Sequence, residues 1–198
     1  MKEAFYEESA LSAKSKSETK LYTLFKVVAF IFFGAGLIIG TFAATIVVSA
    51  IEQTSGFQRV LALVEYFGLI ASFIGVGLVS WFIKNRFNVS YDYTFVEDEL
   101  RITKVFNGKR RKHIITMKAD HILQLGWVES DAFDRQRAGL QGKKPKVMTP
   151  NREPMEGKEF YYVLYSSSIE KSLHIIETRQ LMLEYLVRAA GRTKLERK

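Results

Sequence analysis

The longest uncharged stretch of the chain lies between Lys26 and Glu52 and consists mainly of Phe, Ile, Val, Ala and Gly. This stretch, Val27–Ile51, contains 25 residues. As an α-helix with a rise of about 1.5 Å per residue, it would extend roughly 37 Å, which is enough to cross a hydrocarbon core of about 30 Å. We therefore expect a transmembrane helix here.

A second apolar stretch follows at about Val60–Ile83, and its one charged residue is Glu65. The 18 uncharged residues from Tyr66 onwards suffice by themselves for a membrane span. The connection between the two stretches is short and polar. The sequence thus predicts an antiparallel two-helix transmembrane hairpin over residues 27–83.

Glu65 is expected about one turn inside the outer boundary of the membrane, at the interface. A carboxylate in a transport path is the alternative, but two helices provide no pathway without oligomerisation.

A cleaved signal peptide is the main alternative for the first stretch, because Val48-Ser49-Ala50 has the small residues of a cleavage site. The apolar stretch is longer than the usual core of roughly 7–15 residues, and about 26 residues precede it. We therefore expect an uncleaved span.

Lysine and arginine residues are concentrated on one side of the predicted spans. Lys14, Lys16, Lys20 and Lys26 precede the first span, Lys84 and Arg86 follow the second, and the turn has only Arg59. The positive-inside rule therefore predicts that both termini lie in the cytoplasm. Zero cysteines fit a reducing compartment. Residues 1–26 form a cytoplasmic segment, for which a surface helix and disorder both stay open.

Small residues recur at helical spacing in both spans. Such rows allow two helix backbones to approach closely. Packing within the hairpin and a homodimer interface are both compatible with the pattern. The candidate packing residues are Gly36, Gly40, Ala44, Gly68, Ser72 and Gly75.

From Asn88 onwards the apolar pattern changes from helical spacing to alternation, which indicates half-buried strands. Asn107-Gly108 is a strong signal for a type I′ hairpin turn. Two strands are predicted at 89–95 and 100–106, on either side of an acidic turn at 97–99. Further strands are predicted at 111–117, 122–128, 160–165 and 172–177.

Residues 134–158 contain all three prolines and are expected to form a long loop. A helix should follow the last strand, with Thr178 as its N-cap and Gly191 just past its end. Strands followed by one amphipathic helix favour a soluble α+β domain at 88–198, a small antiparallel β-barrel or sandwich closed by a C-terminal helix.

The stretch YDYTFVEDELRITKVFNGKRRKHIITMKADHI, which starts at Tyr91, resembles the opening hairpins of pleckstrin-homology-like (PH-like) domains of bacteria. With the predicted membrane hairpin, most of the chain is similar to an uncharacterised (DUF-type) family of small bacterial membrane proteins. About six strands are visible where that fold has seven, so the missing strand is expected in or beside the proline-rich loop. The resemblance implies a fold and a location, and it transfers no catalytic residue.

The formal net charge of +8 resides in the soluble domain, because residues 84–198 have 23 Lys and Arg against 15 Asp and Glu. An anionic lipid surface attracts such a domain, whereas no nucleic-acid-binding motif is present. One basic run follows the Asn107-Gly108 turn, where a loop of the resembled fold meets phosphoinositide headgroups in eukaryotic members. The candidate lipid-contact residues are Lys109, Arg110, Arg111, Lys112, Lys143, Lys144 and Lys146.

We find no pattern that predicts catalysis, a cofactor or a metal site. The histidines His113, His121 and His174 lack the spacing of a zinc site and are expected to be structural or at the surface. The leading hypothesis is a membrane-anchored, non-enzymatic interaction or scaffold module with a protein partner. An anionic-lipid-contacting domain is the alternative, and a subunit of a transporter or other membrane complex is a third.

Overall fold

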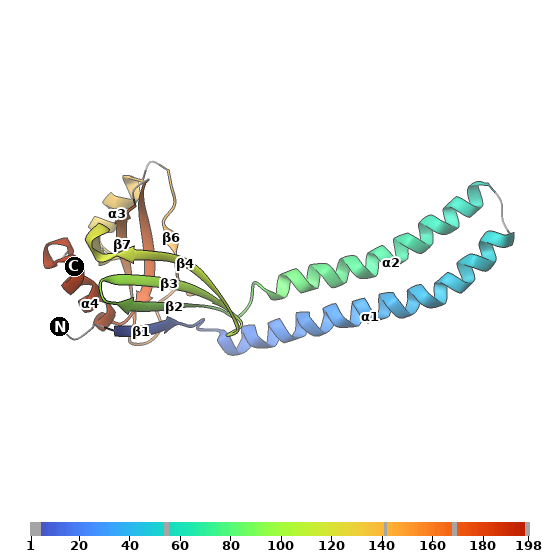
Figure 1. Ribbon diagram of the computed structural model, residues 1–198, viewed down its shortest axis with the longest axis horizontal. Coiled ribbons are helices and arrows are strands. Elements are labelled where there is room, and N and C mark those ends of the chain that lie inside the picture. The colour runs from blue at the N-terminus through green and yellow to red at the C-terminus, as the bar shows by residue number, and fades with distance from the viewer. Residues whose placement is uncertain (1–4, 54–55, 141, 168–169, 197–198) are drawn as a thin grey trace. The chain divides into compact units, whose positions relative to one another are not determined.

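A computed structural model describes residues 5–53, 56–140, 142–167 and 170–196 of the chain. The chain divides into two compact units (Figure 1). One unit is the helical segment Lys16–Phe87. The other combines the residues up to Ser15 with those from Asn88 onwards, so the helical segment interrupts the second unit in sequence.

The helical unit is a pair of long helices, α1 (Ser15–Gln53) and α2 (Phe57–Lys84). By length and composition, both are able to cross a membrane. Only 17% and 6% of the residues in their most apolar stretches are buried within the protein. A core helix of a soluble protein would be mostly buried, so the apolar surface of this unit requires another apolar environment.

Glycines in both helices make close helix contacts possible inside the hairpin. A Cβ atom on Gly36 would lie 3.1 Å from the Phe73 Cβ, and one on Gly77 would lie 2.5 Å from the ring of Phe33. The Tyr66 hydroxyl also donates a hydrogen bond of 3.0 Å to the carbonyl of Gly40. These glycines therefore pack within the hairpin.

The candidate packing residues of α2 lie away from the close contacts between α1 and α2. A Cβ atom added to Gly68 or Gly75 would have no neighbour within 4 Å among the described residues. Ser72 is exposed and donates its hydroxyl hydrogen to the Leu69 carbonyl, 2.6 Å away. Gly68, Ser72 and Gly75 therefore do not serve close packing between α1 and α2.

The other unit is built on two four-stranded sheets. The first is antiparallel with the order β1-β2-β3-β4, and the second has the order β5-β7-β8-β6 with β6 parallel to β8. The strands of the first sheet are β1 (Phe5–Ala10), β2 (Val89–Val96), β3 (Glu99–Phe106) and β4 (Arg110–Lys118). Those of the second are β5 (Ile122–Trp127), β6 (Lys146–Val147), β7 (Glu159–Ser166) and β8 (Lys171–Thr178).

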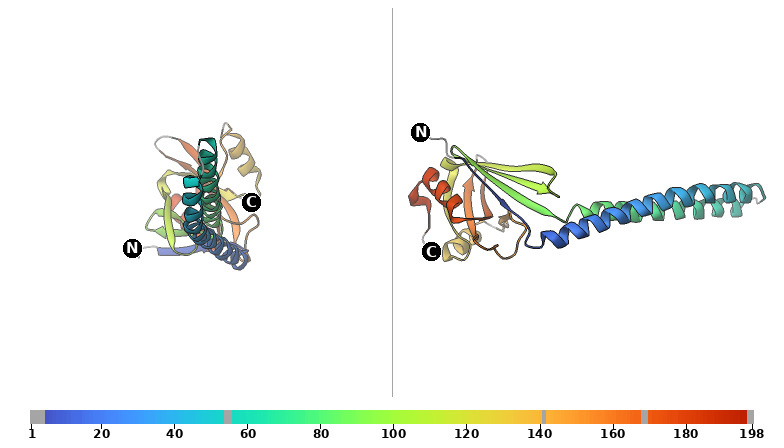
Figure 2. Two further views of the ribbon diagram at one scale, coloured as in Figure 1. Left: turned by 90° about the vertical axis from the view of Figure 1, so that its right-hand side faces the viewer. Right: turned by 90° about the horizontal axis from the view of Figure 1, so that it is seen from below.

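The main core lies between these two sheets, whose strands cross steeply (Figures 1 and 2). Tyr93 and Ile102 contribute to it from the first sheet and Val163 from the second. Helix α4 (Gln180–Ala190) contacts β2 and β8 and adds Met182 and Leu186. The core therefore joins both sheets and the C-terminal helix into one unit.

A smaller apolar cluster lies under helix α3 (Asp131–Ala138). Phe133 of α3 packs against Tyr162 with the ring centroids 5.7 Å apart. Tyr162 and Leu164 alternate along β7 with residues of the main core, so α3 covers the other face of the second sheet.

Several features differ from the sequence-based expectations. The two sheets are not closed into a barrel by pairing among the described residues, because the short helix Ala119–His121 separates β4 from β5. Of the two expected alternatives, the closed barrel is thus wrong and two packed sheets are present, although the parallel strand β6 departs from the antiparallel pattern. Residues 134–158, expected to be a loop, contain the end of α3 as well as β6.

The residues at the two ends of the C-terminal helix also differ in part from the sequence-based prediction. Thr178, the predicted N-cap, is the last residue of β8, and Arg179 occupies the cap position. Gly191 follows the helix with a φ of 105°, a conformation that glycine adopts readily.

The N-terminal segment, for which a surface helix and disorder were both open, contains strand β1. Its sequence FYEESA lacks a clear apolar alternation because it is an edge strand. The strand expected in or beside the proline-rich loop is present as the short β6, and β1 is a further strand that the sequence analysis did not predict.

Candidate functional site at the root of the first sheet

The helical pair is inserted between two adjacent, hydrogen-bonded strands. Strand β1 ends at Ala10, which lies opposite Tyr91 near the start of β2, and all of α1 and α2 lies between them in sequence. Both connections to the helices therefore leave the same end of the first sheet (Figure 1). We call this end of the sheet, with the adjoining turn between β3 and β4, the root end.

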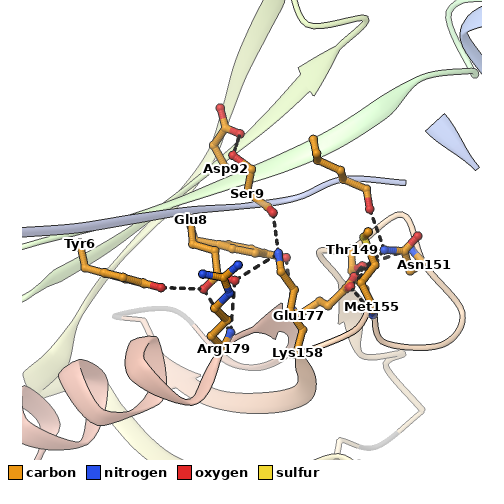
Figure 3. Close-up of polar contacts among 12 residues, drawn as sticks. Tyr6, Glu8, Ser9, Asp92, Thr149, Asn151, Met155, Lys158, Glu177 and Arg179 are labelled. Carbon is orange, nitrogen blue, oxygen red and sulfur yellow. Dashed lines mark hydrogen bonds and ion pairs between the residues drawn. The ribbon is translucent and has the colours of Figure 1, made fainter. Parts of the chain in front are cut away.

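Strand β1 is held on the domain by a buried ion pair. The Lys158 ammonium lies 3.1 Å from the Glu8 carboxylate, and these side chains are only 10% and 7% exposed (Figure 3). Lys158 also donates to the Ser9 carbonyl at 2.6 Å. The backbone N–H of Arg179 donates to the same Glu8 carboxylate at 3.1 Å. Breaking one side of such a pair leaves a buried charge without its partner.

The linker between β1 and α1 is held by one side chain, Asn151. Its amide nitrogen donates to the Leu11 carbonyl and its amide oxygen accepts from the Ala13 N–H, both at 2.8 Å. The same side chain donates to the buried Glu177 carboxylate at 2.8 Å (Figure 3). Thr149 donates to this carboxylate as well. The chain is therefore fixed up to the residues that immediately precede α1.

The other connection to the helices is fixed by two asparagines. Asn88 and Asn107 both have positive φ angles, 54° and 52°, which asparagine tolerates better than most residues. The Asn107 N–H donates to the Asn88 carbonyl at 2.8 Å, and the Asn88 side-chain amide donates to the Asn107 side-chain oxygen at 2.7 Å. The β3–β4 turn is therefore bonded to the residue at which the chain returns from α2.

The predicted turn itself is present. Asn107 and Gly108 both have positive φ, and the Lys109 N–H donates to the Phe106 carbonyl at 3.1 Å. This places the run Lys109, Arg110, Arg111 and Lys112 at the root end of the sheet.

The strand pleat divides this basic run between two faces. Lys112 lies directly opposite Lys104 of β3, and Arg110 lies opposite Phe106, so these side chains share one face. Like charges in directly opposite positions destabilise a sheet, and an anion beside them would relieve the repulsion. The Lys104 ammonium lies 5.4 Å from the Tyr91 ring centroid and 5.3 Å from that of Phe106. We call Lys104, Lys109, Arg110, Arg111 and Lys112 the root cluster.

Arg111 points to the other face, where its guanidinium lies 3.7 Å from the Asp92 carboxylate. The Ser9 hydroxyl donates to the same carboxylate at 2.7 Å. Asp92 thus links β1, β2 and β4 at the root end and balances one charge of the cluster.

Comparison with known proteins places this architecture in a family. The family model described as "Bacterial PH-like domain (DUF6106)" matches residues 3–195, from the N-terminal strand through both apolar helices to the C-terminal helical turn. The chain belongs to this family. The function of this family is uncharacterised. The comparison with curated proteins and the comparison with solved structures found no match to the chain.

Within the PH-like domain, the second group of predicted lipid-contact residues lies just before and at the start of β6 in the other sheet. Lys146 is in β6, opposite His174 of β8, and Lys143 forms an ion pair with Glu170. Lys144 is exposed between them. The structure thus brings Lys109–Lys112 together with Lys104, whereas Lys143 and Lys144 precede β6 of the second sheet and Lys146 is its first residue.

The sequence analysis missed Lys104 as a member of the root cluster. The Asn-Gly turn was a sufficient signal to align β3 with β4. However, the loop has three residues, and a register shift between Ile102 and Thr103 changes the pairing further along the strands. The position of Lys104 opposite Lys112 follows from the three-residue loop, because the register shift lies beyond this pair.

The opposite end of the first sheet is acidic. Glu97 and Asp98 form the β2–β3 turn, and with Glu99 and Asp120 they line a pocket of about 300 Å³. Lys118 is the cation in the lining of that pocket. The first sheet of the PH-like domain therefore has a basic root end and an acidic opposite end.

His174 is fully buried in β8, and burial lowers its pKa to about 4, with Lys146 contributing. One ring nitrogen lies 2.8 Å from the Ser172 hydroxyl. This histidine is therefore neutral at neutral pH. Among the described residues, no group of three or more His, Cys, Asp or Glu side chains could hold a metal ion.

Proposed function

We propose that this chain is a membrane-anchored, non-enzymatic interaction module at the inner face of the bacterial cell membrane. The main observation that supports this proposal is the insertion of two long apolar helices between the paired strands β1 and β2. Because one β-ladder joins both ends of the insertion, both ends must lie on the same side of the bilayer. An anchor of two antiparallel spans meets this requirement.

The fold also bears on the alternative of a cleaved signal peptide. Cleavage after Ala50 would separate β1 from the rest of the first sheet, leaving Lys158 without Glu8 in a nearly dry site. Retention of the first span is therefore part of the proposal. The lysines before α1 and the basic residues after α2, against one arginine in the turn, favour a cytoplasmic location for the domain.

The test removes the insertion. We define the soluble version as the chain in which residues 14–87 are replaced by a short Gly-Ser linker, so that Asn151 keeps both of its linker contacts. We expect the full chain to remain in membranes after alkaline carbonate extraction and the soluble version to be folded and free of the membrane. Extraction of the full chain by carbonate would contradict the anchor.

Contact of the root cluster with anionic lipid headgroups is a second candidate function. It is favoured by the like-charged pair Lys104 and Lys112 beside the residue where the chain returns from α2. Each basic residue near an anionic surface contributes about 1 kcal/mol of attraction. In a membrane-anchored chain, this attraction would orient the domain on the surface to which it is tethered.

Liposome binding of the soluble version tests this second function. The triple change Lys104→Gln, Arg110→Gln and Lys112→Gln should greatly reduce binding to phosphatidylglycerol vesicles. The matched control is Lys143→Gln, Lys144→Gln and Lys146→Gln, which removes equal charge from the segment that leads into β6. Equal losses in both variants would show an effect of net charge alone and would contradict a site at the root cluster.

A further inference from the structure

One lysine is buried between the two helices of the hairpin, at the end where the chain leaves α2. Lys84 is only 4% exposed, although it directly follows the predicted span that ends at Ile83. Its ammonium lies 2.8 Å from the centroid of the Trp81 ring and 5.7 Å from that of Tyr22 in α1. This cation therefore lies between aromatic rings of both helices.

The aromatic residues around Lys84 are packed against further rings of the hairpin. Phe30 of α1 lies edge-on to Trp81, with the ring centroids 5.9 Å apart. Phe25 of α1 stacks on Phe87, just past the end of α2, at 5.6 Å. Tryptophan and tyrosine favour the level of the lipid headgroups in a membrane. Lys84 therefore lies in an ordered aromatic site at the level expected for lipid headgroups.

The positive charge of Lys84 is not balanced within the part of the chain that the structure describes. Neither its ammonium nor that of Lys26 in α1 forms an ion pair with a carboxylate there. The electrostatic interaction between these two lysines is unfavourable, because both side chains are cations. A cation–π contact and the carbonyl end of a helix each favour a cation by less than the cost of removing an ammonium from water. The site therefore has an excess of positive charge.

We propose that the phosphate group of an anionic phospholipid occupies this site and pairs with Lys84 and Lys26. The inference rests on the proposed membrane anchor and adds a lipid-binding site made of residues other than the root cluster. Phosphate oxygens accept charge-assisted hydrogen bonds from ammonium groups.

The position of the two lysines indicates the kind of lipid. Lys26 directly precedes the first predicted span and Lys84 directly follows the second, so both lie where lipid phosphates are found. Two ammonium groups repel the choline or ethanolamine cation of a zwitterionic headgroup. The expected ligand is therefore a lipid of the phosphatidylglycerol type, which has a phosphate without a cation.

The experiment follows the fluorescence of Trp81 in the full chain. The protein has two tryptophans, so Trp127→Phe leaves Trp81 as the one indole. The chain is placed in phosphatidylcholine nanodiscs that contain an increasing fraction of phosphatidylglycerol, at an ionic strength that screens exposed charges beyond about 8 Å. We expect a saturable change of emission, because a phosphate that pairs with Lys84 draws its ammonium away from the indole.

Variants locate the binding. Lys26 is exposed, so Lys26→Gln should leave the fold intact and raise the phosphatidylglycerol fraction at half-saturation by about fivefold. The matched control is Arg86→Gln, which removes the same charge from an exposed residue just past α2 and should shift this fraction by less than about twofold. Lys84→Gln should abolish the saturable response, and Lys84→Arg, which keeps the charge, should retain it.

Several results would overturn the inference. A response without saturation, or the same saturable response in Lys84→Gln, would show that surface charge alone changes the emission. Equal shifts in Lys26→Gln and Arg86→Gln would contradict a site between the helices. A saturable response to glycerol 3-phosphate in discs of phosphatidylcholine alone would identify a soluble phosphate, and not a lipid, as the ligand. None of these results affects carbonate extraction, so the failure of this site is distinguishable from the failure of the membrane anchor.

Discussion

Lys158 and Glu8 form a nearly dry ion pair that joins residues 150 positions apart and attaches the strand preceding the first apolar helix to the domain. Desolvation makes such a pair a modest net stabiliser, but the loss of one partner leaves an uncompensated charge, at a cost of roughly 3–5 kcal/mol. The attachment of β1 to the domain therefore depends on the presence of both residues.

We predict that Lys158→Met lowers the free energy of unfolding of the soluble version by about 3 kcal/mol, as measured by denaturant titration. Adding Glu8→Gln should restore part of the loss, because the buried charge then disappears. Lys143→Met is the matched control: its pair with Glu170 is exposed and screened by solvent, so its loss should have a much smaller effect. A similar effect of both lysine changes would contradict this interpretation.

A second prediction concerns the linker between β1 and α1. Because the Asn151 side chain bonds Leu11 and Ala13, Asn151→Ala should free the linker and increase the rate of tryptic cleavage after Lys14 in the full chain. Mass spectrometry of the fragments measures the rate. Gln136→Ala, which removes a side-chain bond to Gln124 elsewhere in the domain, should leave the rate unchanged. An unaltered rate in Asn151→Ala would show that other contacts hold the linker.

The third prediction follows from His174. Its pKa is near 4 in the folded domain and about 6.5 in an unfolded chain, so the unfolded chain binds more protons between these values. Stability should therefore fall as the pH decreases below about 6.5, with a loss of roughly 2 kcal/mol at pH 5. Above pH 7 this histidine should contribute no pH dependence.

The variant His174→Gln keeps a polar group near Ser172 and removes the titration. Denaturant unfolding at pH 7.5 and pH 5 measures the difference, and the soluble version with His174 should lose more stability between the two than the variant does. Identical losses would mean that His174 becomes protonated without an unfavourable change of environment.

The fourth prediction separates the glycines of α2. Gly77 lies against Phe33, so Gly77→Leu should disrupt the hairpin and reduce the yield of folded full chain in detergent. Gly68→Leu is the matched control, because a Cβ at that position has open space among the described residues. Proteolysis of the detergent-solubilised chain measures the difference. Equal sensitivity of the two variants would argue against close packing at Gly77.

The elements with strong patterns were predictable from the sequence. The uncharged runs gave two long helices, and alternation with the Asn-Gly turn gave β2, β3 and β4 to within about one residue. Strand β1 was not predictable in this way, because a charged residue, Glu8, stands between Tyr6 and Ala10 on the side packed against the core, and its partner is 150 residues away. Helix α3 was missed because its eight residues bury only Ala132 and Phe133, too few for a helical period.

The candidate site likewise has one part that was predictable from the sequence and another part that was not. Lys109–Lys112 were visible as a run, but the pairing of Lys112 with Lys104 depends on the three-residue length of the β3–β4 loop. The insertion between β1 and β2 was also hidden, because an edge strand with weak alternation precedes a long apolar run. Long-range pairing, and not local pattern, defines the root end.

The most direct test of the central claim is cysteine labelling in intact bacterial cells, since the chain has no native cysteine. The two labelling positions are Gln58→Cys, at the start of α2 next to the interhelical turn, and Lys109→Cys, in the root cluster. A membrane-impermeant maleimide should label position 58 in intact cells and position 109 only after permeabilisation. Labelling of position 109 from outside intact cells would contradict a domain anchored at the inner face of the membrane.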